Sequence, residues 1–206
     1  RSSSSVPTMR SRWAETHRDA PGARIAAVDA RRHGWYATFG PARQSDKSAK
    51  GTAGGVAALV KKYLTNLPLS DAKGPQGDIG GSFDYVGRSI RVGGQEVLVF
   101  GGYFEGGSEL RSCNQTILLR IDYWTRGGAV PFILMADFNM PLIGWDKAEI
   151  DWRSKLKAVT IAPRGESITC RAGKGSLIDY ALVSEAIAPL IDSFEVDLTG
   201  PFWPHW

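Results

Sequence analysis

The sequence predicts a single domain of the mixed α/β class, and three observations lead to that prediction. The chain has 206 residues, of which 43% are hydrophobic and 22% are charged, as in a globular protein rather than a disordered tail or a coiled coil. Segments with the pattern of buried strands alternate along it with segments of helical periodicity. Two of the expected strands flank Gly93-Gly94, a tight hairpin signal because glycine tolerates positive φ at both turn positions.

The first third of the chain predicts one helix and two strands. Asp19 and Pro21 signal a helix start, apolar residues then recur at helical spacing, and Gly34 ends the helix. The segments after it are expected to be a strand, a polar loop, a buried strand and an irregular Pro/Gly-rich stretch, at 35–39, 42–52, 54–60 and 67–81.

The remainder of the chain predicts the hairpin, two helices and two more buried strands. The hairpin strands are expected at 83–92 and 96–100. An apolar stripe from Leu110 to Trp124 predicts a helix that Gly127-Gly128 stops. A central strand, a mixed-charge helix and another buried strand are expected at 130–136, 146–156 and 177–183. Ser184 is then expected to cap a short helix that Pro189 limits.

Composition excludes several classes of protein. The longest apolar run, 129–136, is far shorter than the roughly 20 residues that span a bilayer, so we expect no membrane partner. Cys113 and Cys170 are too few for a disulfide scaffold and form no metal pattern, which suits an intracellular location. Residues 1–62 carry 12 Lys and Arg against 4 Asp and Glu, whereas residues 63–206 carry 13 against 17. The basic first third favours a phosphate-rich partner, although solvated surface cations produce the same count.

Polar residues interrupt the two most apolar strands in places where chemistry is often found. The strand at 130–136 ends in Asp137, followed by Asn139, and strand alternation predicts that both side chains project to the same side. The carboxyl ends of strands are where open α/β sheets place ligands. An Asp that only caps the next turn is the alternative interpretation.

Asp179 lies inside a second apolar strand pattern, and its charge requires a cation, a histidine or several donors if it is buried. A core Asp bonded to backbone amides is the alternative. Three further candidates are His205, Glu15 with His17 two residues on, and Tyr103 just beyond the hairpin. A histidine beside an acid acts as an acid or base near neutral pH, whereas one among aromatics is more often structural.

Taken in order, these stretches resemble the endonuclease/exonuclease/phosphatase superfamily, which includes AP endonucleases, deoxyribonuclease-like enzymes and the endonuclease domains of LINE-type retrotransposons. The motifs that carry the resemblance are Glu15-Thr16-His17, Gly54-Gly55-Val56-Ala57, Tyr103 with Asn114, Ala136-Asp137-Phe138-Asn139-Met140, Ser176-Leu177-Ile178-Asp179-Tyr180 and Pro204-His205. Ala14 and Pro204 stand where the family usually has Gln and an acid. The resemblance covers the chain from about Trp13 to its end.

The resemblance implies a four-layer, deoxyribonuclease-like α/β sandwich: two sheets of mixed, largely antiparallel strands flanked by helices. We expect a disordered or irregular segment at 1–12. The resemblance implies an endonuclease/exonuclease/phosphatase-like domain at 13–206 that is truncated at both ends, because the family's first and last strands fall outside it. The implied site lies at one rim, between the sheets.

The resemblance also implies metal-assisted hydrolysis of a phosphodiester. Glu15 would hold Mg²⁺, or alternatively Mn²⁺, and Asp137 would orient or deprotonate the attacking water. Asn139 and Tyr103 would donate hydrogen bonds to the developing charge, and Asp179 would hold His205 at the phosphate. Two further residues, Asn114 and Ser176, would contact the substrate.

The leading hypothesis from the sequence is a Mg²⁺-dependent endonuclease that nicks DNA within a retroelement-like protein, with DNA favoured over RNA and a nuclear location if DNA is the substrate. One alternative is a phosphatase or phosphodiesterase of small or lipid phosphates on the same fold. Another is a non-catalytic remnant that only binds nucleic acid.

Overall fold

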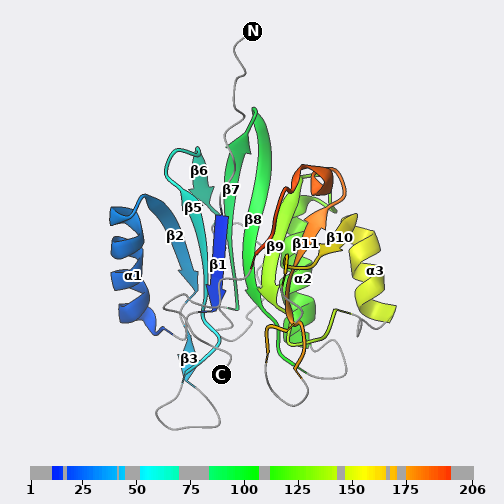
Figure 1. The fold of residues 1–206 in the computed structure, drawn as a ribbon, viewed down its shortest axis with the longest axis horizontal. Helices are drawn as coiled ribbons and strands as arrows, with labels where there is room; N and C mark the ends of the chain where they lie inside the picture. The colour runs from blue at the N-terminus through cyan, green and yellow to red at the C-terminus, as the bar shows by residue number, and fades with distance from the viewer. Residues whose placement is uncertain are drawn as a thin grey trace.

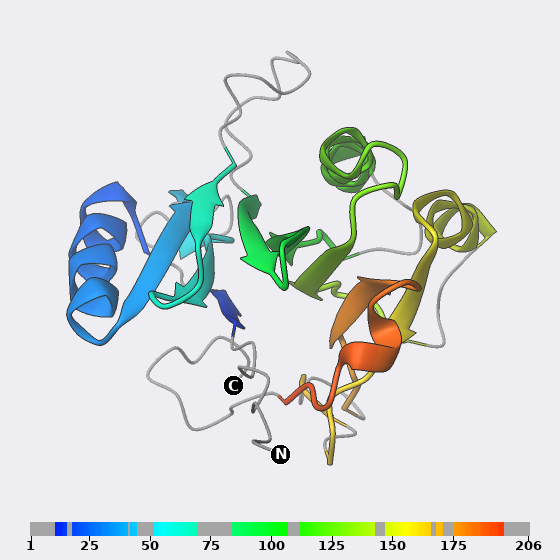
Figure 2. The same cartoon turned by 90° about the horizontal axis from the view of Figure 1, so that it is seen from above.

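Two β-sheets pack face to face and helices cover their outer faces, which makes four layers (Figures 1 and 2). The computed structural model describes residues 11–15, 18–40, 42–44, 52–69, 84–106, 112–142, 147–165, 168–170 and 175–195. Helix α1 lies outside the smaller sheet, and α2 and α3 lie outside the larger one (Figure 2). This is the two-sheet sandwich flanked by helices that the resemblance implies.

The smaller sheet is built from three antiparallel strands in the order β1-β5-β2. The strands are β1 (Ser11–Glu15), β2 (Trp35–Gly40) and β5 (Val56–Lys61). Helix α1 (Ala20–Arg32) begins as the sequence predicts, because the Asp19 side chain accepts a hydrogen bond of 2.9 Å from the Gly22 N–H. Gly34, with φ of 82°, follows its end.

The larger sheet has six strands in the order β10-β11-β9-β8-β7-β6. Their bounds are β6 (Asn66–Pro68), β7 (Tyr85–Val92), β8 (Gln95–Tyr103), β9 (Phe132–Asp137), β10 (Ala158–Ile161) and β11 (Asp179–Ser184). Strands β8 and β9 are parallel, and α2 (Ser112–Thr125) makes the crossover between them. The other neighbouring pairs in this sheet are antiparallel. Helix α3 is Lys147–Leu156, and a two-residue ladder joins β3 (Arg43–Gln44) to β4 (Thr52–Ala53).

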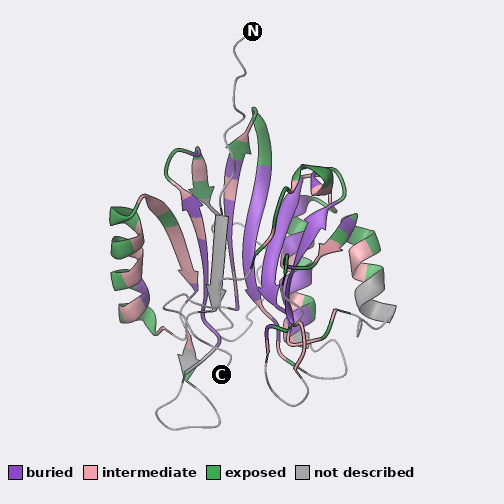
Figure 3. Ribbon diagram, in the orientation of Figure 1, coloured by how far each residue is buried: buried purple, intermediate pink, exposed green. Residues whose placement is uncertain are grey.

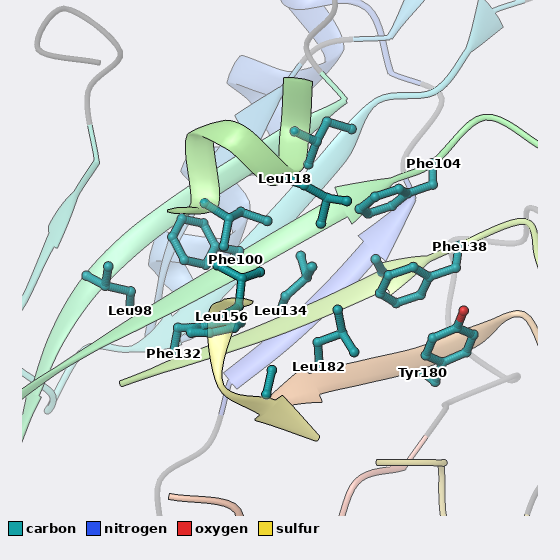
Figure 4. Close-up of a cluster of buried hydrophobic side chains, with 14 residues drawn as sticks. Leu98, Phe100, Phe104, Leu118, Phe132, Leu134, Phe138, Leu156, Tyr180 and Leu182 are labelled. Carbon is teal, nitrogen blue, oxygen red and sulfur yellow. The ribbon is translucent and has the colours of Figure 1, made fainter. Parts of the chain in front are cut away.

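The larger sheet is buried on both faces, and strands β8, β9 and β11 are buried along most of their length (Figure 3). Its outer face packs against the helices through a cluster that includes Phe100, Leu118, Leu134 and Leu156 (Figure 4). Its inner face meets the smaller sheet through a second cluster of buried residues: Val60, Leu64, Ile90, Val97, Val99, Ile133, Met135, Ala181, Val183 and Ile187. Side chains alternate between these two cores along each strand, so residues two positions apart in a strand face the same core.

The structure differs from the sequence-based expectation around Ser184. This residue does not cap a helix: it ends β11, is 3% exposed, and its hydroxyl oxygen accepts a 2.8 Å hydrogen bond from the Phe132 N–H. The short helix that follows is a 3₁₀ turn at Ala188–Leu190, with Ile187 at its N-cap and no side-chain cap. Strands β1, β6 and β10 and the β3–β4 ladder were not predicted, and β1 begins at Ser11, inside the segment expected to be disordered or irregular. Strand β8 runs three residues beyond the expected strand end at 100.

No described helix is both long and apolar enough to cross a membrane.

Candidate active site

Three of the predicted site residues lie side by side in one row across the larger sheet. The register pairs Tyr103 of β8 with Asp137 of β9, and Asp137 with Asp179 of β11. We call these three residues the polar row. Residues paired in register project from the same face of a sheet, so these three side chains share a face. The row crosses the end of the sheet where β8 and β9 end and β11 begins (Figure 1).

The shared face is the inner one, between the two sheets. Val99, Met135 and Ala181 stand an even number of residues before or after the row, and they belong to the inner core. Tyr103 itself packs against a cluster that Val56 and Ala58 of the smaller sheet form with Val86 of β7. The row therefore lies at the rim of the gap between the sheets, where the resemblance implies the site.

A second row, of aromatic rings, backs the first on the outer face. Phe104, Phe138 and Tyr180 each follow one member of the polar row, and their rings form a stack (Figure 4). The centroids of Phe104 and Phe138 are 4.7 Å apart, and those of Phe138 and Tyr180 are 4.1 Å apart with an interplanar angle of 5°. Phe138 and Tyr180 are 1% and 0% exposed. This rigid stack holds the three strand ends level with one another.

Asp137 is the central member of the row and is fully buried, with 0% exposure. Burial raises the pKa of its carboxyl group well above the usual range, and the neighbouring negative charge of Asp179 raises it further. A hydrogen bond from the Asn139 backbone N–H to Oδ1, 2.7 Å long, acts in the opposite direction. A buried carboxyl group with a raised pKa is suited to accept a proton near neutral pH.

A turn, and not strand alternation as the sequence predicts, sets the position of Asn139. Strand β9 ends at Asp137, and Asn139 has the left-handed φ of 49°, so strand alternation does not extend to it. Asparagine adopts this conformation more readily than most residues. The turn directs its backbone N–H back to Asp137, while its side-chain amide donates a 2.9 Å hydrogen bond to the Phe104 carbonyl.

Asp179 is 4% exposed, and burial raises the pKa of its carboxyl group to about 6. A hydrogen bond from the Thr169 side chain acts in the opposite direction. The sequence predicts that a buried Asp here needs a partner, and Thr169 supplies one. Thr169 was not among the sequence candidates, because it lies ten residues earlier and on no predicted element.

Asn114 is buried at the start of α2, with 1% exposure, and its amide holds the segment that follows Tyr103. Its Oδ1 accepts from the Glu105 N–H and its Nδ2 donates to the Glu105 carbonyl, both at 2.9 Å. Its contact with substrate stays a prediction. Ser176, the other residue expected to contact substrate, is half-buried and forms an isolated bridge with Cys170.

Asp84 extends the row by one strand, and the sequence analysis missed it. The Tyr103 N–H donates a 2.7 Å hydrogen bond to the Asp84 carbonyl, so Asp84 stands next to Tyr103 in the register. It is 3% exposed, and its carboxylate lies against Gly54, where a Cβ atom would be 2.7 Å from Oδ1. The predicted two-residue hairpin at Gly93-Gly94 already implies this pairing, because it places residue 84 opposite residue 103.

Three predicted residues are only partly placed or not placed. The backbone of Glu15 ends β1 and is paired with Val56, and β1 runs close to β8 and β9. The end of β1 therefore comes to the same rim as the polar row. Nothing in the structure bears on the Glu15 side chain, and His205 and His17 lie outside the described residues.

Within the described ranges, no group of three or more His, Cys, Asp or Glu side chains is arranged to hold a metal ion. For Glu15, the residue expected to hold Mg²⁺, the structure describes the backbone alone.

Several solved structures have a fold similar to that of this chain. The endonuclease domain of TRAS1, a telomere-specific non-LTR retrotransposon, matches 93% of this chain and 92% of its own length, with a TM-score of 0.60 and 17% sequence identity. A β-hairpin deletion mutant of beta toxin from Staphylococcus aureus matches 99% of this chain and 83% of its own, with a TM-score of 0.56 and 15% identity. The human Nocturnin catalytic domain matches 77% of this chain and 63% of its own, with a TM-score of 0.51 and 16% identity.

These matches show that the chain has the fold of the endonuclease/exonuclease/phosphatase superfamily, as the sequence resemblance implies. No family model matches the sequence, and no curated protein matches it at a significant level. The likeness is therefore one of fold, at sequence identities that do not transfer an activity.

Proposed function

We propose that this chain, with its deoxyribonuclease-like fold, is a divalent-metal-dependent phosphodiesterase that nicks DNA as part of a retroelement-like protein. The observation that supports this most is the row of Tyr103, Asp137 and Asp179 at the rim between the sheets, in the register that pairs all three. Such a row presents a proton acceptor, a hydroxyl donor and a second carboxyl group to one bound phosphate.

The donor chemistry at this rim suits Mg²⁺, and Mn²⁺ is the alternative. Asp137 and Asp179 are buried neighbours whose carboxyl pKa values are raised, and a nearby cation offsets the repulsion between such groups. Carboxylate oxygens are also the ligands that Mg²⁺ prefers. Glu15, at the end of β1, would hold the ion. When bound, the ion polarises a phosphoryl oxygen and stabilises charge on the leaving oxygen.

The chain's own residues supply the proton transfer and the hydrogen bonds. Asp137 accepts the proton of the attacking water, and the Asn139 N–H that bonds to its Oδ1 keeps the carboxyl group in one orientation. The Asn139 amide has two N–H donors. One bonds to the Phe104 carbonyl, and the other is assigned to a phosphoryl oxygen. Tyr103 donates its hydroxyl to the same developing charge, and Asp179 holds His205 at the phosphate.

Two observations favour DNA as the substrate. The first 62 residues carry a large excess of Lys and Arg, and contacts between cations and phosphates supply most non-specific affinity for nucleic acid. The fold also covers nearly the whole length of a retrotransposon endonuclease domain. We place the protein inside the cell, and in the nucleus if DNA is its substrate.

A plasmid-nicking assay tests this proposal. Supercoiled plasmid is incubated with the protein and Mg²⁺, with Mn²⁺ or with EDTA, beside the variants Asp137→Ala and His205→Ala. Exposed residues of the same types offer matched controls, Asp151→Ala on α3 and His33→Ala after α1. We expect nicking that requires metal, survives in both controls and falls by about 10²-fold or more in both test variants.

Other outcomes separate the alternatives. Nicking that persists in Asp137→Ala contradicts the proposed role of that residue. Release of phosphate from small phosphomonoesters or inositol phosphates, with plasmid untouched, identifies a phosphatase. Binding to plasmid without nicking, with an affinity that falls steeply as salt rises, identifies a non-catalytic nucleic-acid-binding protein.

A further inference from the structure

Thr169 is a buried polar residue outside the described helices and strands, and its hydroxyl bonds to the backbone where β11 begins, at Asp179 of the polar row. It is 4% exposed and lies between β10 and β11. We propose that Thr169 is a positioning residue for Asp179. The Thr169 hydroxyl fixes the Asp179 side chain beside Asp137, with a carboxylate oxygen of Asp179 as the hydrogen-bond acceptor. This inference rests on the proposed phosphodiesterase function, to which it adds a residue that acts without touching substrate.

The hydrogen bonds around the Thr169 hydroxyl determine where its proton goes. Oγ1 accepts from the backbone N–H of Ile178 at 3.0 Å and from that of Asp179 at 3.1 Å. A hydroxyl oxygen has two lone pairs and one proton. With both lone pairs engaged, the hydroxyl has only its proton left to offer, and the Asp179 carboxylate accepts it. Thr169 therefore holds the backbone and the side chain of Asp179 together.

Backbone hydrogen bonds of Thr169 and Cys170 with Ser176 hold Thr169 in place, and we call them the backbone clip. Its N–H donates to the Ser176 carbonyl at 3.0 Å, and Cys170 and Ser176 exchange two backbone hydrogen bonds of 2.9 Å each. Thr169, ten positions before Asp179 in sequence, thereby meets the first residue of β11. Because backbone groups make the clip, a substitution of the Thr169 side chain leaves its hydrogen bonds available.

The hydroxyl offsets the influences that oppose ionisation of Asp179. Burial raises the pKa of Asp179, and the Thr169 hydrogen bond lowers it. The charged group that faces Asp179 from β9 is Asp137, its partner in register, and β1 with Glu15 at its end passes close to β9. A carboxylate among acidic neighbours needs a fixed donor to remain an acceptor, and a hydrogen bond to a charged group is stronger than one between neutral groups.

The test compares Thr169→Val, which keeps the shape and removes the hydroxyl, with Thr169→Ser, which keeps the hydroxyl. Two measurements are made on the full chain. The first is plasmid nicking with Mg²⁺ over a series of pH values, as kcat and KM. The second is the pH titration of the Asp179 carboxyl group by ¹³C NMR in metal-free protein labelled at Asp side chains, with Asp179→Asn to assign the signal.

We expect Thr169→Val to lower kcat by about tenfold or more with little change in KM. The acid limb of the pH profile of kcat should move to higher pH in this variant. The Asp179 titration moves to higher pH in the same variant, and Thr169→Ser restores both to nearly the wild-type values. A Val variant that is folded, by its far-UV spectrum and unfolding transition, but titrates Asp179 as wild type does overturns the inference. Equal losses in the Val and Ser variants also overturn it.

The NMR titration keeps this inference separate from the proposed function. If the wild-type protein hydrolyses no phosphodiester, the proposed function fails, while the Asp179 titration still reports whether Thr169 controls that carboxyl group. If nicking is present and the titration does not respond to Thr169→Val, the positioning role fails and the proposed function stands.

Discussion

Replacing Asp179 by asparagine is expected to stabilise the metal-free protein above pH 6, although the same change should abolish its activity. Asp179 is 4% exposed and stands in register with the buried carboxyl group of Asp137. Its ionised form is therefore disfavoured in the folded state, whereas in the unfolded chain it ionises freely. Asparagine is nearly isosteric and its amide oxygen still accepts the Thr169 hydroxyl proton, but it carries no charge.

The magnitude follows from the pKa of Asp179, which is about 6 in the folded protein against an ordinary value of 3.8. Between these two pH values the folded state binds more protons than the unfolded state, so the free energy of unfolding falls as pH rises. The loss begins near the unfolded value and is complete above the folded one. At roughly 1.36 kcal/mol per pH unit, the total is about 3 kcal/mol.

Urea unfolding in EDTA at half-unit steps from pH 4 to pH 8 measures this effect in wild type and Asp179→Asn. The two proteins should have nearly equal free energies of unfolding near pH 4, where Asp179 is protonated. Above pH 6 the variant should exceed wild type by up to about 3 kcal/mol. A difference that stays constant across the whole pH range would refute the reasoning, because it would mean that the folded protein does not oppose ionisation of Asp179.

Three further predictions concern the supports of the site. Gly54→Ala should destabilise the protein by roughly 1–3 kcal/mol, because φ is +65° and the new Cβ would lie 2.7 Å from Asp84 Oδ1. Its control is Gly93→Ala, where φ is +59° but nothing lies within 4 Å, and urea unfolding should show the smaller loss there. Phe138→Ala should cost about 3–5 kcal/mol, since the ring is buried between two others; a loss under 1 kcal/mol would contradict the aromatic stack. Asn139→Gly should keep the left-handed turn and lose only about 1 kcal/mol, for the bond to the Phe104 carbonyl, while plasmid nicking falls; Asn139→Ala should lose more stability in a thermal unfolding scan, because alanine also strains the turn.

The local elements of the fold could be predicted because their signals are contained within a few residues. Asp19 and Gly34 bound α1, and Gly93-Gly94 closes the hairpin of β7 and β8, as the sequence predicts. The short strand β10 has no comparable signal. It is a strand because β11 offers it hydrogen bonds, and such pairing depends on where β11 lies in the folded chain.

The candidate site likewise contains residues that could be predicted from the sequence and residues that could not. Asp137, Asp179 and Tyr103 could be identified because a polar residue inside an apolar strand pattern or just beyond its end is visible in sequence. The register shows that the three are neighbours. The structure adds Asp84 and Thr169. Asp84 was open to prediction from the hairpin register, whereas Thr169 was not, because a backbone clip and no periodic pattern carries it to Asp179.

The sequence by itself determined the helices, the long central strands, the hairpin turn and the acids that these strands carry, because hydrophobic periodicity and turn residues act over short distances. Only the tertiary structure decided which acids are adjacent and how they ionise. Neighbours along the row from Asp84 through Tyr103 and Asp137 to Asp179 lie 19 to 42 residues apart in the chain, and burial and charge act through space. The raised pKa values of Asp137 and Asp179 therefore belong to the packed sheets, not to any stretch of the chain read alone.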